Sequence, residues 1–394
     1  MVVLNMEIIS KEMIRPSSPT PHHRITNLKL SFLDQIAPPV YVPLIFFYQN
    51  DEPDLKNTNH AQKSQLVKQS LSKILTEFHP VAGRIQENSL VDCNDAGAEF
   101  IEARVHTRLT QIIKEPKMEE LKQFLPVETL SYQTEKAILS VKITFFDCGG
   151  IAVGVCLSHK IADGTSLVAF MNAWAATCRD QVIGSEPSFD MAAHFPPMDL
   201  SGASGFTQLK QLAAAGGGGD VKNPTRVEAV SAFIWRHFID AAKAKAKLLL
   251  GDDINKLKTS SFVAVHAGDC DIVNKLRDAI REIDEGYVNK VQNGEYLRLL
   301  SKSVDLVKGD DVEICNFSSW CRFPMYEADF GWGKPVWVCT TTLPFKNLVI
   351  LMSTPCGGGI EAWVNVPRDE LNMLQTHYDM LGSVTSMDFV NASN

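Results

Sequence analysis

The chain has 394 residues, of which 45% are hydrophobic and 21% are charged. This composition is typical of a folded globular protein and argues against a disordered or fibrous chain. At roughly 100 to 200 residues per domain, the length predicts two domains. The formal net charge of -8 offers no basic footprint for nucleic acid or for an anionic membrane surface, so the sequence favours small-molecule partners.

The nine cysteines indicate a reducing compartment. Their number is odd, no two form a CxxC pair, and most of them lie in apolar stretches. This distribution is typical of reduced thiols and not of a disulfide framework or a zinc site. The first residues lack the apolar core of a signal peptide, and no segment reaches about 18 uninterrupted apolar residues. We therefore expect a cytoplasmic protein without a membrane-spanning helix.

A helix, a hairpin and a second helix are predicted in the first half of the chain. Residues 64–78 place apolar side chains at helical spacing. Residues 138–159 form two β-rich runs around the turn sequence DCGG, which predicts a β-hairpin. Apolar positions within 167–175 then predict a helix that begins near Thr165. His159 therefore lies at the exit of a strand, a short connector away from a helix.

The second half begins after a stretch typical of a linker. Residues 200–220 contain six glycines and many small residues, so we predict a domain at 1–199, a linker at 200–220 and a second domain at 221–394. The later predicted elements are a helix over 227–247, a hairpin of 347–353 with 359–366, and a helix from Pro367. Strands and helices mix in both halves, which predicts two α/β or α+β domains.

His159 and Asp163 are the first candidates for chemistry. A histidine at a strand end is more often structural than catalytic, and an Asp just before a helix is a preferred N-cap. The functional interpretation is that neutral His159 takes a proton from an alcohol or amine, while Asp163 fixes the loop that aims the imidazole. The spacing alone leaves both interpretations open.

A second distinctive stretch is SSWCRFPMYEADFGWGKP at residues 318–335. Two glycines around Trp332, with Asp329 ahead of them, favour a fixed loop over a phosphate cradle, and a structural turn is the favoured interpretation of Asp329. The chain has no GxxxxGK[ST] run and no strand-linked GxGxxG run, so phosphoryl and hydride transfer lack their usual signatures. The ten histidines show no HExxH or paired ligand spacing, so no metal is predicted.

These two stretches together resemble the plant BAHD acyltransferases. HKIADG at 159–164 matches the HxxxD signature of that family, and DFGWG at 329–333 matches its second signature. LSFLDQ, LSKILTEFHPVAGRI and PTRVEAVSAFIWRH extend the resemblance along most of the chain. Within the family, SSPTP, SHKIAD, SSWCR and CTTT are most similar to alkaloid O-acetyltransferases.

The resemblance implies an α/β fold of mixed α+β type. It consists of two similar-sized domains related to chloramphenicol acetyltransferase, each a mixed sheet flanked by helices, with a solvent channel between them. Acyl-CoA and the acceptor enter this channel from opposite faces and meet at the histidine of HxxxD. His159 then acts as the base, Asp163 gives structural support through a bridge to an arginine, and Ser318 steadies the tetrahedral oxyanion.

The second signature is implied to be structural. Asp329, Phe330, Gly331, Trp332 and Gly333 hold a loop of the C-terminal domain and the coenzyme channel, away from the chemistry. The implied activity is the transfer of acetyl from acetyl-CoA to a hydroxyl of a plant alkaloid or related specialised metabolite. The implied mechanism is direct attack without an acyl-enzyme, in a cytoplasmic monomer that uses acyl-CoA as co-substrate and needs no metal.

Three alternatives remain open at this level. The acyl donor could be another acyl-CoA, or the acceptor a terpenoid or a phenolic. The chain could also be a catalytically inactive binding relative. A cysteine hydrolase that uses Cys156 is the third class, although residues 156 and 159 would point to opposite faces of a strand.

The chain lacks a stretch that the family usually contains. Between FVAVHA at 262–267 and GDCDIVNKL at 268–276, members normally carry an Asn-x-Arg run and a Pro-rich stretch that ends in Gly-Asn. Either this is a real deletion, or the sequence joins pieces of a longer protein. The arginine that the resemblance gives Asp163 lies in that stretch, so the implied bridge has no partner in this sequence.

Overall fold

The chain forms two compact units. The first comprises Met1–Met198, Arg322–Pro344 and Ser353–Gly359, and the second comprises Asp199–Cys321, Phe345–Met352 and Ile360–Asn394. The computed structural model describes residues 4–20, 27–49, 60–127, 136–184, 186–200, 224–250, 269–281, 283–293, 295, 315–341 and 345–366.

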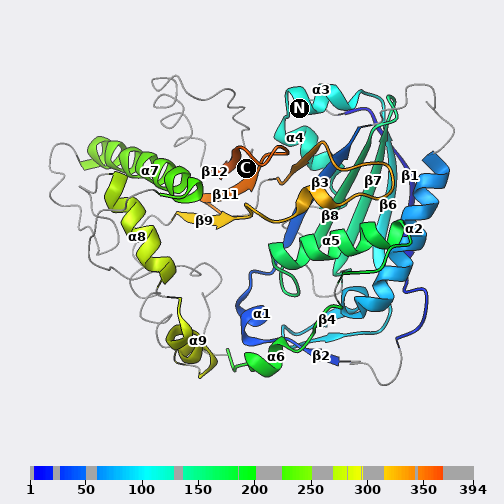
Figure 1. The fold of residues 1–394 in the computed structure, drawn as a ribbon, viewed down its shortest axis with the longest axis horizontal. Helices are drawn as coiled ribbons and strands as arrows, with labels where there is room; N and C mark the ends of the chain where they lie inside the picture. The colour runs from blue at the N-terminus through cyan, green and yellow to red at the C-terminus, as the bar shows by residue number, and fades with distance from the viewer. Residues whose placement is uncertain are drawn as a thin grey trace. The chain divides into compact units, whose positions relative to one another are not determined.

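The first unit is built on a six-stranded mixed sheet (Figure 1). Its strands in spatial order are β1 (Met6–Ile14), β6 (Ala98–Val105), β7 (Leu139–Phe146), β8 (Ile151–Ser158), β3 (Tyr41–Tyr48) and β10 (Trp337–Cys339). β6 and β7 run parallel, and the other neighbouring pairs run antiparallel. The predicted hairpin is confirmed, because β7 and β8 pair from Leu139 opposite Leu157 to Phe145 opposite Ile151.

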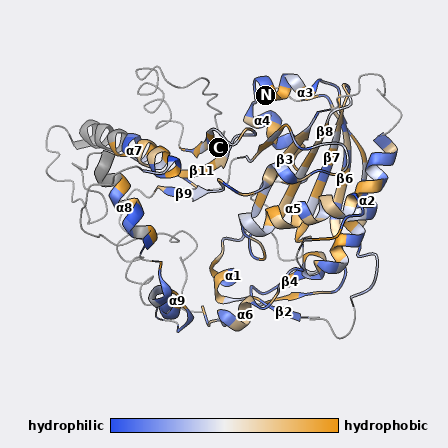
Figure 2. Ribbon diagram, in the orientation of Figure 1, coloured by the Kyte–Doolittle hydropathy of each residue, from blue (hydrophilic) through white to orange (hydrophobic). Residues whose placement is uncertain are grey.

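The centre of this sheet is fully buried. Every residue of β3, β7 and β8 is buried, and Figure 2 colours these strands mainly as hydrophobic. Such unbroken apolar strands need cover on both faces. Helices α2 (His60–Glu77) and α5 (Gly164–Cys178) pack side by side against one face, where Trp174 Nε1 donates to Ser70 Oγ over 3.0 Å (Figure 1). The two helices predicted from the apolar spacing are therefore confirmed.

Short elements complete the first unit. They are a small sheet in the order β2 (Asn27–Lys29), β5 (Leu90–Asp92) and β4 (Arg84–Gln86), the helices α1 (Phe32–Ile36), α3 (Leu109–Lys114), α4 (Met118–Leu121) and α6 (Met191–His194), and the 3-10 turns His79–Ala82, Lys122–Phe124 and Met325–Glu327. Helix α1 comes shortly before β3 in the sequence.

The second unit combines a sheet with long helices. Its described strands lie in the order β12 (Ile360–Asn365), β11 (Leu348–Ser353) and β9 (Asn316–Ser319), and its helices are α7 (Arg226–Leu250), α8 (Asp269–Arg281) and α9 (Glu285–Gln292). Ile234 and Phe238 of α7 pack on Val349 and Leu351 of β11. The predicted helix over 227–247 and the predicted strands at 347–353 and 359–366 are therefore present, whereas the helix predicted from Pro367 lies outside the described residues.

The division into units differs from the predicted one in the second half of the chain, where Arg322–Pro344 and Ser353–Gly359 belong to the first unit. The first break falls between Met198 and Asp199, beside the predicted boundary, and residues 201–220 of the predicted linker lie outside the described residues. Residues 329–333, however, belong to the first unit and not to the C-terminal domain. The reason is strand pairing, because β10 follows this loop and joins β3 as an antiparallel neighbour.

The described helices include none that is long and apolar enough to cross a membrane.

Candidate active site

The end of β8 holds the backbone of His159. Ser158, the last residue of that strand, pairs with Tyr41 at the start of β3. The His159 N–H donates to the carbonyl of Val40 over 2.9 Å, which extends the β3–β8 ladder by one residue. The side chain of His159 is half-buried. A histidine in this place combines a fixed backbone with partial access from outside, as a working base requires.

Asp163 begins helix α5. Ile161 N–H and Ala162 N–H both donate to the Ser158 carbonyl, at 3.1 and 3.2 Å, so the chain turns tightly after the strand. Asp163 then occupies the N-cap position, where its Oδ1 accepts a hydrogen bond from Ser166 N–H over 2.8 Å. Four residues therefore lead from the strand exit to the helix, and Asp163 determines where the helix starts.

The N-cap geometry accounts for Asp163 without an arginine. Within the part of the chain that the structure describes, Asp163 forms no ion pair, and its carboxylate is exposed. The junction at 267–268, where the family's arginine is missing, lies outside the described residues.

Substitution of Asp163 separates its two possible roles. Asp163→Ala removes the cap and should lower the free energy of unfolding by about 1 kcal/mol, whereas Asp163→Asn keeps an equally good cap and should unfold like the wild type. Urea denaturation of both variants measures this difference. If Asp163 supports activity through its N-cap hydrogen bond, Asp163→Asn should retain activity. A stable but inactive Asp163→Asn protein would show instead that the negative charge is required.

Residues of α1 support this region, and the sequence analysis did not single them out. Ser31 and Asp34 form a capping box at the start of α1, in which Ser31 N–H donates to Asp34 Oδ2 over 2.8 Å and Asp34 N–H donates to Ser31 Oγ over 3.2 Å. The signal was visible as S-x-x-D within LSFLDQ, which resembles the known Ser/Thr-x-x-Glu capping pattern.

The DFGWG loop closes on its own aspartate. Asp329 Oδ1 accepts hydrogen bonds from Gly331 N–H and Gly333 N–H, at 2.8 and 3.0 Å. The two glycines have φ values of +102° and +98°, a region of backbone conformation that other residues rarely adopt. Arg179 Nη1 lies 4.0 Å from Asp329 Oδ2. These contacts agree with the interpretation of Asp329 as the centre of a structural turn.

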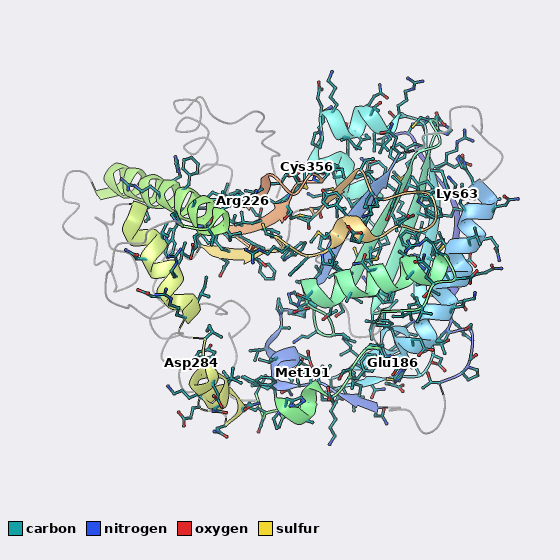
Figure 3. All side chains as sticks on the ribbon, in the orientation of Figure 1. Lys63, Glu186, Met191, Arg226, Asp284 and Cys356 are labelled. Carbon is teal, nitrogen blue, oxygen red and sulfur yellow. The ribbon has the colours of Figure 1, made fainter. Side chains whose placement is uncertain are left out.

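Aromatic packing joins this loop to helix α5 and strand β3. Phe330 is 2% exposed and meets the ring of Trp174 on α5 edge-on, with the ring centroids 4.9 Å apart. Trp332 stacks on Phe330 at 5.5 Å, and Lys63 Nζ lies 5.6 Å from the Trp332 centroid (Lys63 is labelled in Figure 3). Tyr48 meets both rings edge-on, and its hydroxyl donates to the Ala328 carbonyl over 2.7 Å. Burial raises the pKa of Tyr48 well above its ordinary value, so the phenol stays protonated.

Ser318 belongs to the second unit. It lies in β9 opposite Ile350 of β11, and its Oγ accepts a hydrogen bond from Trp320 Nε1 over 3.0 Å. Because this bond uses a lone pair, the hydroxyl hydrogen can donate to another acceptor. Local contacts therefore place His159 and Asp163 in one short connector between β8 and α5. They also hold the five DFGWG residues in one loop. Ser318 belongs to the second unit.

Cys156 is unsuited to act as a nucleophile. It is fully buried in β8, and its Sγ lies 3.7 Å from the Val127 carbonyl. Burial raises the pKa of the Cys156 thiol to about 12, so the reactive thiolate is scarce at neutral pH. This environment argues against the cysteine hydrolase alternative.

Thiol alkylation tests this conclusion. Cys356 is exposed in the turn between β11 and β12, where a hydrogen bond with the Thr354 hydroxyl lowers its thiol pKa (Cys356 is labelled in Figure 3). We expect iodoacetamide to modify Cys356 early and to leave activity unchanged, as followed by intact mass and by turnover after removal of the reagent. Cys356→Ser is the control, and it should lose the early modification. A loss of activity in step with labelling of Cys156 would contradict the assignment.

Within the described ranges, no three His, Cys, Asp or Glu side chains gather where they could hold a metal ion.

Comparison with known proteins identifies the family. Residues 4–202 and 257–381 match the family described as the Transferase family. The chain is 41% identical to stemmadenine O-acetyltransferase of Catharanthus roseus and 39% identical to vinorine synthase of Rauvolfia serpentina, in each case over 98% of this chain and 99% of the relative. Both alignments span 431 positions, more than the 394 residues of this chain, so both relatives contain segments that have no counterpart here.

Solved structures agree with this result. The crystal structure of vinorine synthase superposes with a TM-score of 0.75 at 35% identity, over 95% of this chain and 98% of that chain. A structure of F. graminearum TRI101 complexed with coenzyme A and T-2 mycotoxin shares the fold, with a TM-score of 0.61 at 16% identity over 89% of this chain and 97% of that chain. The predicted fold class, a mixed α/β protein of two domains, is confirmed. The chain belongs to the Transferase family and is a BAHD acyltransferase.

Proposed function

We propose that this enzyme transfers acetyl from acetyl-CoA to a hydroxyl group of a plant alkaloid or a related specialised metabolite. The observation that carries the proposal is the placement of His159, which is half-buried and held at the exit of β8 by the Val40 carbonyl. The identity of 41% to stemmadenine O-acetyltransferase and of 31% to salutaridinol 7-O-acetyltransferase supports the choice of acetyl and of such an acceptor.

His159 supplies the general base in this proposal. An alcohol is almost entirely un-ionised at neutral pH, so its attack on a thioester needs a base at hydrogen-bond distance. The imidazole of His159 takes the hydroxyl proton while the oxygen forms a bond to the thioester carbonyl carbon. The carbon–sulfur bond then breaks, the coenzyme thiolate leaves, and the imidazolium returns the proton to the sulfur. Ester and free coenzyme thiol result, and no acyl-enzyme is required.

Asp163 and Ser318 have supporting roles. Asp163 caps α5 and so maintains the connector that carries His159. The Ser318 hydroxyl, which already accepts a hydrogen bond from Trp320, can donate its own hydrogen to the oxyanion of the tetrahedral intermediate. Removal of one such donor typically costs roughly 10²–10³-fold in kcat.

We propose that the protein acts as a cytoplasmic monomer. The odd number of cysteines, with no CxxC pair among them, supports a reducing compartment. The co-substrate and the acceptor are both small molecules, and the chemistry needs no metal, because a positioned base and an activated thioester suffice.

Two alternatives are kept for specific reasons. A terpenoid acceptor is kept because limonoid 1-O-acetyltransferase of Citrus sinensis is 33% identical to this chain, and it ranks second because stemmadenine O-acetyltransferase is 41% identical. An inactive binding relative is kept because relatives contain segments that are absent here.

A transfer assay distinguishes these possibilities. Purified protein is incubated with acetyl-CoA and a panel of hydroxylated indole and benzylisoquinoline alkaloids, limonoids and phenolics, and the release of coenzyme thiol is recorded together with the mass of the acceptor. The proposal predicts acetylation of an alkaloid, and a longer acyl-CoA tested in parallel should react more slowly. Binding of coenzyme A without turnover of any acceptor would overturn the proposal in favour of a binding protein.

A further inference from the structure

The residue after His159 has an unusual environment for a lysine. Lys160 is only 6% exposed, and its Nζ donates to the carbonyl of Gln35 over 2.8 Å and contacts the carbonyl of Asp34 at 3.4 Å. A buried ammonium group is costly unless it is hydrogen-bonded, so these contacts must be maintained whenever the fold is intact. Lys160 therefore connects the His159 connector to α1, which lies about 125 residues earlier in the chain.

Helix α1 is itself held from several directions. The Ser31–Asp34 capping box fixes its start. At its end, the Gln35 carbonyl also accepts a hydrogen bond from Asn88 Nδ2 over 3.3 Å, and Gln35 Oε1 accepts one from Met198 N–H over 2.8 Å. Phe32 N–H donates to the Phe195 carbonyl over 3.0 Å. The carbonyls that receive the Lys160 ammonium thus belong to a well-anchored element.

Two contacts on opposite sides hold the backbone around His159. On one side its own N–H is bound to Val40, which precedes β3. On the other side the Lys160 side chain is bound to α1, and Lys160 N–H donates to Ser158 Oγ over 3.4 Å. One anchor is part of a sheet ladder and the other is a single side chain. Loss of the side chain would release the connector on the α1 side and leave the sheet intact.

We propose that Lys160 is a positioning residue for acyl transfer, which acts by holding His159 at the distance and angle that proton abstraction requires. This inference rests on the proposed role of His159 as the base. A misplacement of a catalytic group by about 1 Å can cost roughly 10²-fold in rate. The lysine contacts neither the thioester nor the acceptor in this proposal, and its effect passes through His159.

The test replaces the ammonium group and keeps the length of the side chain. Lys160→Met removes both hydrogen bonds, and Lys160→Arg retains a cation that can reach the same carbonyls. We expect kcat of Lys160→Met to fall roughly 10²-fold with KM for acetyl-CoA nearly unchanged, and Lys160→Arg to recover most of the loss. Lys73→Met is the matched control, because Lys73 is 57% exposed and forms a surface ion pair with Asp180, and it should behave like the wild type.

A second readout does not depend on turnover. The protein is labelled with ¹³C at histidine ring carbons, and the His159 signal is assigned from its absence in His159→Ala. Lys160→Met should shift or broaden this signal, while Lys73→Met should leave it in place. Lys160→Gln, which retains a short donor, replaces Lys160→Met if the latter does not fold, and thermal unfolding of every variant is measured in parallel.

The possible results separate the two proposals. No His159-dependent turnover in the wild type would overturn the proposed function, and an unchanged His159 signal in Lys160→Met would overturn the inference on Lys160. A Lys160→Met protein with wild-type kcat would also overturn it. So would failure of both Lys160→Met and Lys160→Gln to accumulate as folded protein, because the lysine would then serve stability alone.

Discussion

His159→Ala is expected to lower kcat for acyl transfer by roughly 10²–10⁴-fold, the usual contribution of a positioned general base. The loss should appear in kcat and in kcat/KM together, because the base acts on the acceptor proton in the transition state. The protein should still fold, since the backbone contact from residue 159 to Val40 does not depend on the side chain. Steady-state kinetics with acetyl-CoA and the preferred acceptor of the panel measure the effect.

The control for this variant is a histidine outside the site. His194 is exposed at the end of α6, 3.7 Å from Asp190, and His194→Ala should retain wild-type rates. His159→Gln keeps polarity at the site without a comparable base, so it should be nearly as slow as His159→Ala. Activity of His159→Ala at a tenth or more of the wild-type rate would show that another group accepts the proton.

Phe330→Ala should cause the largest loss of stability. Phe330 is 2% exposed and contacts the rings of Trp174, Tyr48 and Trp332. Truncation of a buried Phe typically costs about 3–5 kcal/mol, part of it from the cavity that remains. For a domain of this size, that loss corresponds to a fall in Tm of roughly 6–20 °C. Thermal and urea unfolding of the purified variant provide the measurement.

The same variant tests whether the DFGWG loop takes part in chemistry. Below its melting temperature, Phe330→Ala should turn over at close to the wild-type kcat, because the loop is built from internal hydrogen bonds and aromatic packing. Val336→Ala, at a hydrophobic residue 37% exposed just after the loop, is the control and should change Tm little. A Phe330→Ala protein with normal Tm and strongly reduced kcat would contradict the structural role.

The local elements could be predicted from the sequence because their signals are local. The apolar spacing of residues 64–78 and 167–175 corresponds to α2 and α5, and the turn sequence DCGG joins β7 to β8. Asp163 as an N-cap follows from its place before an apolar run. The pairing of β10 with β3 could not be predicted, since a three-residue strand has little pattern of its own and its partner lies nearly 300 residues away.

The site could be predicted only in part for a similar reason. HKIADG indicated His159 and Asp163, yet the same hexapeptide contains Lys160, whose partners are backbone carbonyls of α1. Backbone acceptors carry no sequence signature, so no pattern in one chain could indicate that contact. The aromatic contacts of Phe330 with Trp174 and Tyr48 also join segments that are distant in sequence and become visible only in the fold.

The central claim is direct acyl transfer from the thioester to an alcohol, and a single-turnover experiment tests it most directly. The enzyme, in excess over acetyl-CoA carrying a labelled acetyl group, is mixed with acceptor and quenched at short times, and both the intact protein and the acceptor are weighed by mass spectrometry. The account predicts that the label passes to the acceptor in wild type, that the protein mass never changes, and that His159→Ala leaves the label on coenzyme. Labelled acetyl on the protein that then passes to the acceptor would contradict direct attack.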